Sequence, residues 1–318
     1  MTALPLPPPV LEARSLSRTF SVGTSFWGAR RTLRAVDDVS FALRPGTVTA
    51  LVGESGSGKS TVARLLSKLY EPTAGSILLE NEDVTGLRSR HGLREYRSHV
   101  QMIFQDPFAS LNPVKRVGHH LSRPLRIHGV VPDGQVRERV HELLETVGLV
   151  PAAAVAAKYP HELSGGQRQR VAIARALAVQ PKVVLADEPI SMLDVSIRLG
   201  ILNLVRELRD RERIAFLYIT HDLASARYVA DEIHVMYRGR IVEHGPTEAV
   251  LQSPLHAYTK LLLTAVPRPD SGLETVFWQG RTGETAVLAA RGWDPDVPTA
   301  LVEERRGHFV RRETEATG

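Results

Sequence analysis

The chain contains no cysteine among its 318 residues. Disulfide bonds, thiolate-ligated zinc and cysteine-ligated iron–sulfur clusters are therefore excluded, and the absence suits a cytosolic protein. Long apolar runs are also missing, because no stretch approaches the run of about 18 apolar residues that marks a membrane-spanning helix. The first ten residues, MTALPLPPPV, lack a basic start and are interrupted by prolines. We therefore expect neither a transmembrane segment nor a secretory signal.

The composition is ordinary for a globular protein, with 43% hydrophobic and 24% charged residues. The length allows one large α/β domain with an appendage, or two domains. A net charge of +5 and an isoelectric point near 9.6 would suit an anionic partner. Because the sequence has no long basic block, we attribute the excess charge to a solvated, arginine-rich surface and expect no nucleic-acid partner.

The strongest motif is a glycine-rich loop, GESGSGKST, at residues 53–61. An apolar run precedes it and an amphipathic pattern follows it, which predicts a strand, a loop and a helix. The glycines let successive backbone N–H groups face a phosphate chain, and the helix N-terminus adds its dipole. Lys59 can reach the β- and γ-phosphates, and the Ser60 hydroxyl can ligate Mg²⁺. We expect the whole loop to bind nucleotide: Gly53, Glu54, Ser55, Gly56, Ser57, Gly58, Lys59, Ser60 and Thr61.

Hydrophobic patterns place this loop in an α/β core. Strands are predicted at 10–20, 76–80, 99–104, 183–186 and 214–219, and hairpins at 39–52 and 233–242. Helical patterns dominate 117–157, so we interpret about 98–163 as a helical insertion. The resulting division is a flexible tail at 1–10, a nucleotide-binding domain at 11–265, and a loosely packed C-terminal extension at 266–318.

Polar residues follow two of the strands that are predicted to be buried on both faces. Asp187 and Glu188 end the first strand, and His221 follows the second. In open α/β sheets, ligands lie beyond the carboxyl ends of the strands, where the phosphate loop also lies. Asp187 is placed to hold Mg²⁺, and Glu188 can polarise the attacking water. Taken alone, the acidic pair could be a helix cap, and the histidine could be structural.

A second helix start is predicted at LSGGQ, residues 163–167. A serine hydroxyl and two glycines at a helix N-terminus can bind an anion. The same string is also compatible with an ordinary N-cap serine.

These motifs, in this order, resemble the ATP-binding-cassette (ABC) ATPase family over roughly residues 11–265. The resemblance implies a RecA-like P-loop NTPase core (an α/β fold) with an antiparallel β-subdomain and an inserted helical subdomain. It implies that Gln105 ligates Mg²⁺, together with Ser60 and Asp187, and senses transmembrane partners. It also implies that Phe20 stacks on adenine. Phe26 and Trp27 are alternatives for that role, and plain core packing is an alternative for Phe20.

The resemblance gives LSGGQ a different role from binding its own phosphate loop. Two ATP molecules are sandwiched in a head-to-tail dimer, which closes on binding and reopens after hydrolysis. The catalytic residues implied are Lys59, Gln105, Glu188 and His221. The residues implied to close over ATP in a second subunit are Ser164, Gly165, Gly166 and Gln167. Asp194, from the turn at 191–194, is implied to bind ATP.

Segments at 104–113, 222–246 and 253–267 are similar to the ATPase subunits of dipeptide/oligopeptide and nickel importers. The chain departs from that group at 256–259, where His-Ala-Tyr-Thr replaces His-Pro-Tyr-Thr, and in lacking a cysteine cluster in its tail. The similarity implies a second ATPase subunit (the same chain or another), two integral membrane permeases and, indirectly, an extracytoplasmic substrate-binding protein. It places the chain peripherally on the cytoplasmic face of the membrane.

Other functions are compatible with parts of the pattern. The solute could be nickel or another small molecule. A soluble ABC ATPase of DNA repair or translation usually has two cassettes, coiled-coil arms or zinc cysteines, none of which is found. A P-loop switch or kinase would have no use for LSGGQ, and an export-type cassette would be expected to have a fused membrane domain.

Overall fold

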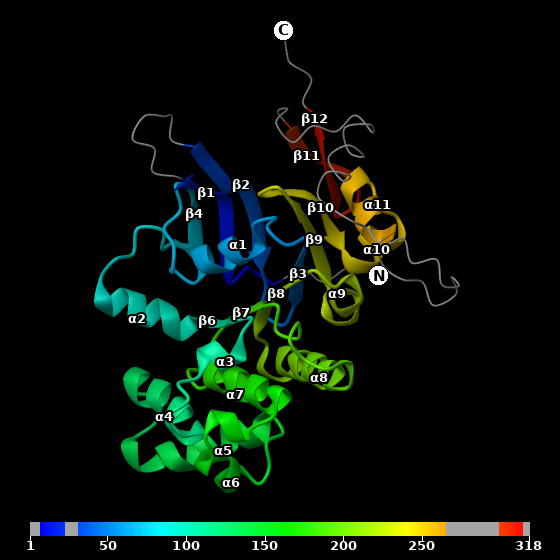
Figure 1. The fold of residues 1–318 in the computed structure, drawn as a ribbon. Helices are drawn as coiled ribbons and strands as arrows, with labels where there is room; N and C mark the ends of the chain where they lie inside the picture. Colours follow the sequence, from blue (N-terminus) through cyan, green and yellow to red (C-terminus); the bar gives the residue numbers. More distant parts are fainter. Residues whose placement is uncertain (1–6, 23–30, 265–298, 314–318) are drawn as a thin grey trace.

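The computed structural model describes residues 7–22, 31–264 and 299–313 (Figure 1). Phe26 and Trp27 lie outside these ranges. The larger of two sheets has the strand order β11-β12-β10-β9-β3-β8-β7-β6. Its parallel part comprises β3 (Val48–Val52), β6 (Val100–Ile103), β7 (Val183–Asp187), β8 (Ala215–Thr220) and β9 (Glu232–Tyr237).

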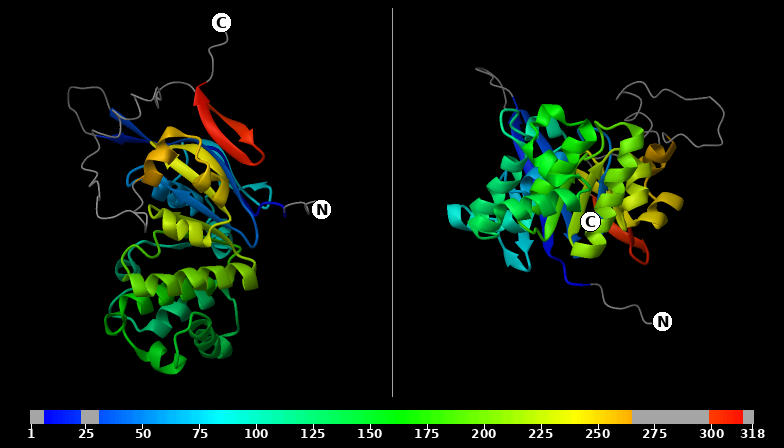
Figure 2. Two further views of the ribbon diagram at one scale, coloured as in Figure 1. Left: turned by 90° about the vertical axis from the view of Figure 1, so that its right-hand side faces the viewer. Right: turned by 90° about the horizontal axis from the view of Figure 1, so that it is seen from below.

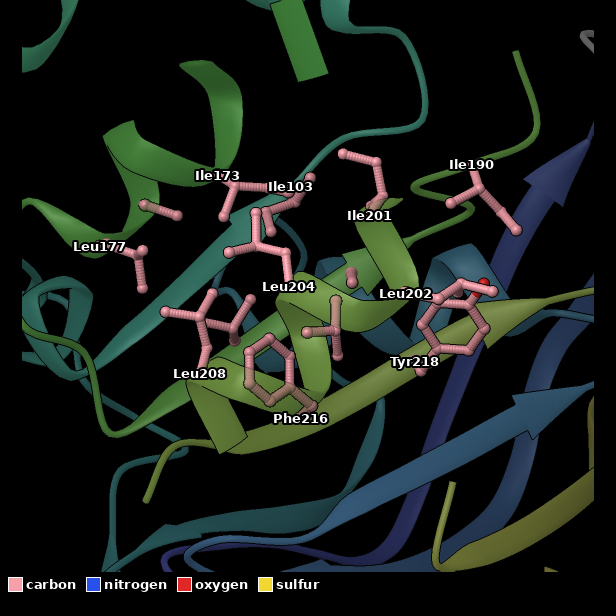
Figure 3. Close-up of a cluster of buried hydrophobic side chains, with 14 of the residues drawn as sticks. Ile103, Ile173, Leu177, Ile190, Ile201, Leu202, Leu204, Leu208, Phe216 and Tyr218 are labelled. Atoms are coloured by element: carbon pink, nitrogen blue, oxygen red, sulfur yellow. The ribbon is translucent and has the colours of Figure 1, made fainter. Parts of the chain in front are cut away.

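The parallel strands are buried on both faces, as their continuous apolar sequences predict. Alternate residues of each strand belong to two different hydrophobic cores. In β8, Phe216 and Tyr218 pack on one face with side chains of two long helices, α7 (Gly165–Leu177) and α8 (Val195–Glu212) (Figure 3). Leu217, on the other face, joins the core beneath the smaller sheet. The sheet therefore holds the carboxyl ends of β3, β7 and β8 at fixed positions.

The smaller sheet is antiparallel and has the order β2-β1-β4-β5. Its strands are β1 (Leu11–Val22), β2 (Arg31–Leu43), β4 (Ala74–Leu79) and β5 (Glu82–Asp83). The hairpin predicted at 39–52 is wrong, because β2 pairs with β1 while β3 lies between β8 and β9. The Pro-Gly signal marks the passage from one sheet to the other. Asp231 fixes the new direction by accepting a hydrogen bond from the Val48 N–H at 2.8 Å.

Helices gather at one end of the molecule, far from the C-terminal strands (Figures 1 and 2). They include α3 (Pro107–Ser110), α4 (Val117–His128), α5 (Val136–Thr146) and α6 (Ala152–Ala157), with 3₁₀ turns at Asp133–Gln135 and Pro160–Glu162. The insertion predicted from about residue 98 begins later, because β6 pairs with β7 in the large sheet. The remaining helices are α1 (Lys59–Leu66), α2 (Arg90–His99), α9 (Leu223–Val229), α10 (Thr247–Gln252) and α11 (Ala257–Thr264).

Both ends of the described chain are packed more tightly than the sequence predicts. Near the N-terminus, Val10 is buried and its N–H bonds the Leu43 carbonyl at 2.8 Å, so the predicted tail at 1–10 is too long. Near the C-terminus, β11 (Thr299–Arg305) and β12 (His308–Glu313) form a hairpin that pairs with β10 (Arg240–Pro246). Residues 299–313 of the predicted extension therefore belong to the large sheet of the cassette.

Three histidines near this edge, of which His234 and His256 are buried and His244 is half-buried, should make stability fall in acid. Burial lowers the pKa of His244 and of His256 to about 4, and lowers the pKa of His234 further below its usual range. The unfolded chain binds protons below a pH of about 6.5, whereas the folded chain does not, so stability is full above that pH and declines toward pH 4. We expect a lower melting temperature at pH 5 than at pH 7. His244→Phe, which preserves stacking on Phe309, should flatten this dependence; an unchanged slope would contradict the assignment.

Candidate nucleotide-binding and hydrolysis site

The phosphate loop joins β3 to α1, as predicted. Gly53 has φ +152°, and a Cβ atom there would lie 2.2 Å from the Met236 carbonyl oxygen. Gly58 has φ +109°, and its Cβ would lie 2.1 Å from the Ala35 carbonyl oxygen. Only glycine tolerates both the backbone conformation and the close approach. The backbones of β2 and β9 therefore lie directly against this loop and fix its path.

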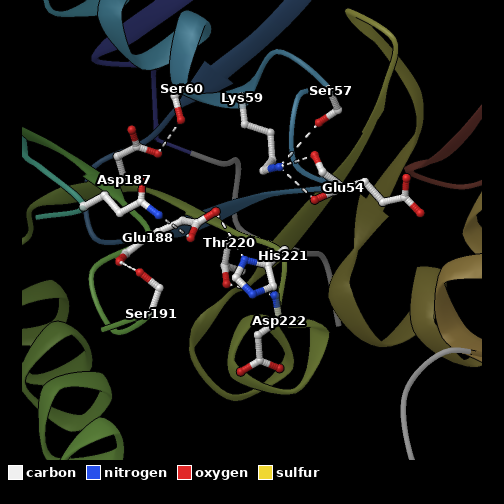
Figure 4. Close-up of polar contacts among 12 residues, drawn as sticks. Glu54, Ser57, Lys59, Ser60, Asp187, Glu188, Ser191, Thr220, His221 and Asp222 are labelled. Atoms are coloured by element: carbon white, nitrogen blue, oxygen red, sulfur yellow. Dashed lines mark hydrogen bonds and ion pairs between the residues drawn. The ribbon is translucent and has the colours of Figure 1, made fainter. Parts of the chain in front are cut away.

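Lys59 is buried beneath the loop with its ammonium group turned onto the loop's own backbone (Figure 4). Its Nζ donates hydrogen bonds to the carbonyl oxygens of Gly53 at 2.8 Å and Glu54 at 2.7 Å. Burial lowers the pKa of Lys59, although the carboxylates of Glu188, Asp187 and Glu54 oppose this shift. The Lys59 ammonium is thus held by hydrogen bonds at the position where an anionic ligand would enter.

Asp187 ends β7 and faces the first turn of α1. Its Oδ1 accepts a hydrogen bond from the Ser60 hydroxyl at 2.9 Å (Figure 4). Burial raises the pKa of the Asp187 carboxyl, while the hydrogen bond from Ser60 opposes the rise. A hydroxyl and a carboxylate oxygen side by side are ligands that Mg²⁺ prefers.

Glu188 is held by two partners at once. Gln105 Nε2 donates to Glu188 Oε2 at 2.9 Å, and His221 Nδ1 lies 3.2 Å from Oε1. The residue has φ +46°, a left-handed conformation that costs a non-glycine residue about 1–3 kcal/mol. The carbonyl of Glu188 accepts a hydrogen bond from the Ser191 hydroxyl at 3.0 Å, which supports this turn. The residues predicted at the strand ends are thus brought together.

The LSGGQ segment starts α7, as predicted, and Ser164 is its N-cap residue. Ser164 Oγ accepts a hydrogen bond from the Gln167 N–H, and Gln167 Oε1 accepts one from the Ser164 N–H, which is a capping box. Ser164 is exposed, so this helix start is open to a ligand. Gly166 packs against α8, because a Cβ there would lie 2.5 Å from Ile197 Cγ2. Asp194, the N-cap residue of α8, is also exposed.

Phe20 lies near the end of β1 and is half-buried. Its ring meets the Tyr70 ring edge-on at 5.5 Å, and the Arg18 guanidinium lies 4.7 Å from the ring centre. An aromatic ring that is only partly covered suits stacking on a base. Sequence reasoning missed Tyr258, whose hydroxyl accepts a hydrogen bond from the Glu54 N–H at 3.0 Å. The local signal for this residue is the string His-Ala-Tyr-Thr at 256–259.

The fold and this arrangement define a P-loop nucleoside triphosphatase with a helical insertion. The LSGGQ segment, with its exposed Ser164, follows that insertion, at the start of α7. Family comparison agrees: residues 36–191 match the ABC transporter family, and residues 242–290 match the oligopeptide/dipeptide transporter C-terminal region. The oligopeptide transport ATP-binding protein OppF of Bacillus subtilis is 50% identical over 246 residues, covering 77% of this chain and 80% of that protein. The di/tripeptide transport ATP-binding protein DppF of Pseudomonas aeruginosa is 45% identical, covering 85% and 84%.

Solved structures show the same likeness. A dimeric ATP-binding cassette in a post-hydrolysis state, bound to ADP and Pi, has a TM-score of 0.66 and 28% identity, covering 74% of this chain and 98% of that one. The cbiO1 protein of Clostridium perfringens, part of an ABC transporter complex, has a TM-score of 0.64 and 29% identity, covering 77% and 91%. The chain belongs to the ABC transporter family of ATP-binding proteins. It is an ATPase, and the predicted RecA-like core is confirmed.

Proposed function

We propose that this chain is the ATP-hydrolysing subunit of an importer for dipeptides or oligopeptides. The observation that carries the proposal is that both the cassette and the C-terminal region match proteins named for oligopeptide and dipeptide transport. In the described ranges, no helix is both long and apolar enough to cross a membrane. From the likeness to importer subunits, we infer that the chain acts peripherally, on the cytoplasmic face, by binding membrane-embedded partners.

The chemistry follows from the site. The loop amides and Lys59 bind the ATP phosphates, Phe20 stacks on adenine, and Glu188 accepts a proton from the water that attacks the γ-phosphorus atom. Gln105 and His221 orient the Glu188 carboxylate, each holding one oxygen. Ser60, Asp187 and Gln105 supply the oxygen ligands for Mg²⁺, which would neutralise phosphate charge when bound.

A second ATPase subunit completes the site. Ser164 and Asp194 are the N-cap residues of α7 and α8, and both are exposed. Their exposure suits contact with ATP that is bound to another chain. Apolar side chains next to Asp194 are exposed as well: Met192 by 55%, Val195 by 78% and Leu199 by 51%. Apolar exposure beside polar site residues is typical of an interaction surface. The partner would be another ATPase chain, identical or not, arranged head to tail.

Ser164→Ala tests the head-to-tail arrangement. We expect hydrolysis to fall about tenfold or more, because a hydroxyl contact to the partner's ATP is lost, while ATP affinity of the isolated chain changes little. An equal loss of affinity in the isolated chain would contradict the arrangement. Ser89→Ala is the matched control, because Ser89 also caps a helix, accepting the Gly92 N–H at 3.0 Å, but lies outside the site. Both changes should lower stability by about 1 kcal/mol.

A basic groove suits the permease contact. It lies beside β6 and the helices that follow Gln105, and its lining includes Arg97, Gln101, Lys115 and Arg123. A cytoplasmic segment of a permease that carries acidic side chains would fit there. Gln105 donates a hydrogen bond directly to Glu188. A partner that shifts the segment around Gln105 would therefore change the position of the Glu188 carboxylate.

Uptake by cells tests the solute. In cells whose chromosomal copy carries Glu188→Gln, we expect uptake of a labelled tripeptide to be lost while nickel uptake is unchanged. Loss of nickel uptake alone would favour a nickel importer. Purification of the chain from native membranes should recover two integral membrane proteins; recovery without them would contradict the importer proposal.

A further inference from the structure

Tyr258 is a fully buried tyrosine at the start of α11. Its hydroxyl accepts a hydrogen bond from the N–H of Glu54, 204 residues earlier in the chain. The ring lies against Tyr237 of β9, with ring centres 4.3 Å apart. The contact therefore joins the C-terminal part of the cassette to the first peptide of the phosphate loop.

This peptide group is held from both sides. The Glu54 N–H belongs to the same planar unit as the Gly53 carbonyl, and in a trans peptide the two groups point in opposite directions. The carbonyl accepts the Lys59 ammonium at 2.8 Å, while the N–H reaches Tyr258 at 3.0 Å. Tyr258 thus fixes the orientation of the carbonyl that positions Lys59.

Tyr258 is itself anchored by a buried carboxylate. Glu243 of β10, which is 0% exposed, accepts the N–H groups of Leu255 and His256 at 2.8 Å each, just before α11. His256 Nδ1 in turn accepts the Tyr258 N–H at 3.1 Å. The C-terminal hairpin completes this anchor, because His308 Nε2 lies 2.7 Å from Glu243 Oε1 and its side chain is 1% exposed.

We propose that Tyr258 is a positioning residue for the phosphate loop, and that the Glu243–His308 pair makes the C-terminal hairpin part of its support. The chain of contacts runs from His308 through Glu243 and the start of α11 to Tyr258, and from there to the peptide that holds Lys59. The C-terminal region then sets ATP affinity without touching ATP. The proposal rests on the phosphate-binding role proposed for Lys59 and is independent of the transported solute.

Tyr258→Phe in the full chain tests the proposal, because it keeps the ring against Tyr237 and removes the hydroxyl that accepts the Glu54 N–H. We expect the Kd and KM for ATP to rise about tenfold, with kcat at saturating ATP within about twofold of wild type. The Glu54 amide should also exchange its hydrogen faster. The control is Tyr96→Phe, which also removes a buried tyrosine hydroxyl, one that donates to the backbone carbonyl of Leu66 at the far end of α1. It should leave Kd and KM unchanged.

A second pair of variants tests the anchor and protects the test against misfolding of Tyr258→Phe. His308→Ala should raise the Kd for ATP about threefold, and His308→Gln, whose amide can still donate to Glu243, should restore it. Wild-type Kd and KM in Tyr258→Phe, or equal effects of the two His308 variants, would overturn the proposal. If Lys59→Met also kept full ATP affinity, the proposed phosphate-binding role would fail; if Lys59→Met lost affinity, only the role of Tyr258 would fail.

Discussion

Glu188→Gln should stop ATP turnover while leaving ATP binding intact. General-base catalysis contributes about 100-fold to 10,000-fold, and an amide of nearly the same shape cannot accept the proton of the attacking water. Gln105 and His221 both contact this side chain, so the amide can remain in place. We therefore expect kcat to fall at least about 100-fold and the Kd for ATP to change less than about twofold.

The control for this variant is Glu248→Gln. Glu248 is half-exposed and pairs with Arg227 at 2.8 Å on the surface, so its loss should change stability and turnover little. Turnover of Glu188→Gln near the wild-type rate would remove Glu188 from the role of general base. A large loss of ATP affinity in the same variant would instead show that Glu188 is needed to form the binding site.

Lys59→Met should abolish tight ATP binding. The Lys59 ammonium has three donors, so it can keep the Gly53 carbonyl that positions it and still donate charge-assisted hydrogen bonds to phosphate oxygens, each worth about 1.5–3 kcal/mol. We expect the Kd for ATP to rise about 100-fold, as measured by titration of the isolated chain. Hydrolysis should fall at least as much, because both binding and charge stabilisation are lost.

Lys68→Met provides a matched comparison. Lys68 is half-buried, and like Lys59 it donates to two backbone carbonyls, here those of Val84 and Thr85, but it follows the far end of α1. Burial lowers the pKa of Lys68 to about 8. Its replacement should destabilise the fold without changing ATP affinity. Equal losses of affinity in both variants would show that the effect of Lys59→Met is general destabilisation.

The sequence predicts the site well where the signal is local. The loop at 53–61 and the polar ends of β7 and β8 are short patterns with direct physical meaning, and the structure places them together. A parallel sheet brings strand ends to one edge whatever the order of the strands, so their convergence could be predicted without the topology. The left-handed backbone conformation of Glu188 could not be predicted, because no local sequence signal requires it.

Errors arose where pairing is distant in sequence. The apolar runs around Pro45-Gly46 look like a hairpin, but each strand finds a better partner elsewhere. The sequence at 266–318 predicts a loosely packed extension because its periodicity is weak and it carries several Pro and Gly. The β11–β12 hairpin instead pairs with β10, which lies more than 60 residues earlier, as the 65-residue separation of Glu243 and His308 illustrates. Tyr258 was missed for the same reason. Propensity and periodicity do not encode which distant segments meet.

We propose that each ATP site combines the phosphate loop of one chain with the LSGGQ segment of another. The test is the rate of ATP hydrolysis by a mixture of Lys59→Met and Ser164→Ala chains. The reference is the rate of the wild-type chain under the same conditions. Each variant alone should be nearly inactive. In a mixed head-to-tail dimer, one site carries both changes and the other carries neither, so an equal mixture should recover roughly a quarter of the wild-type rate. A mixture no more active than its components would contradict the composite site.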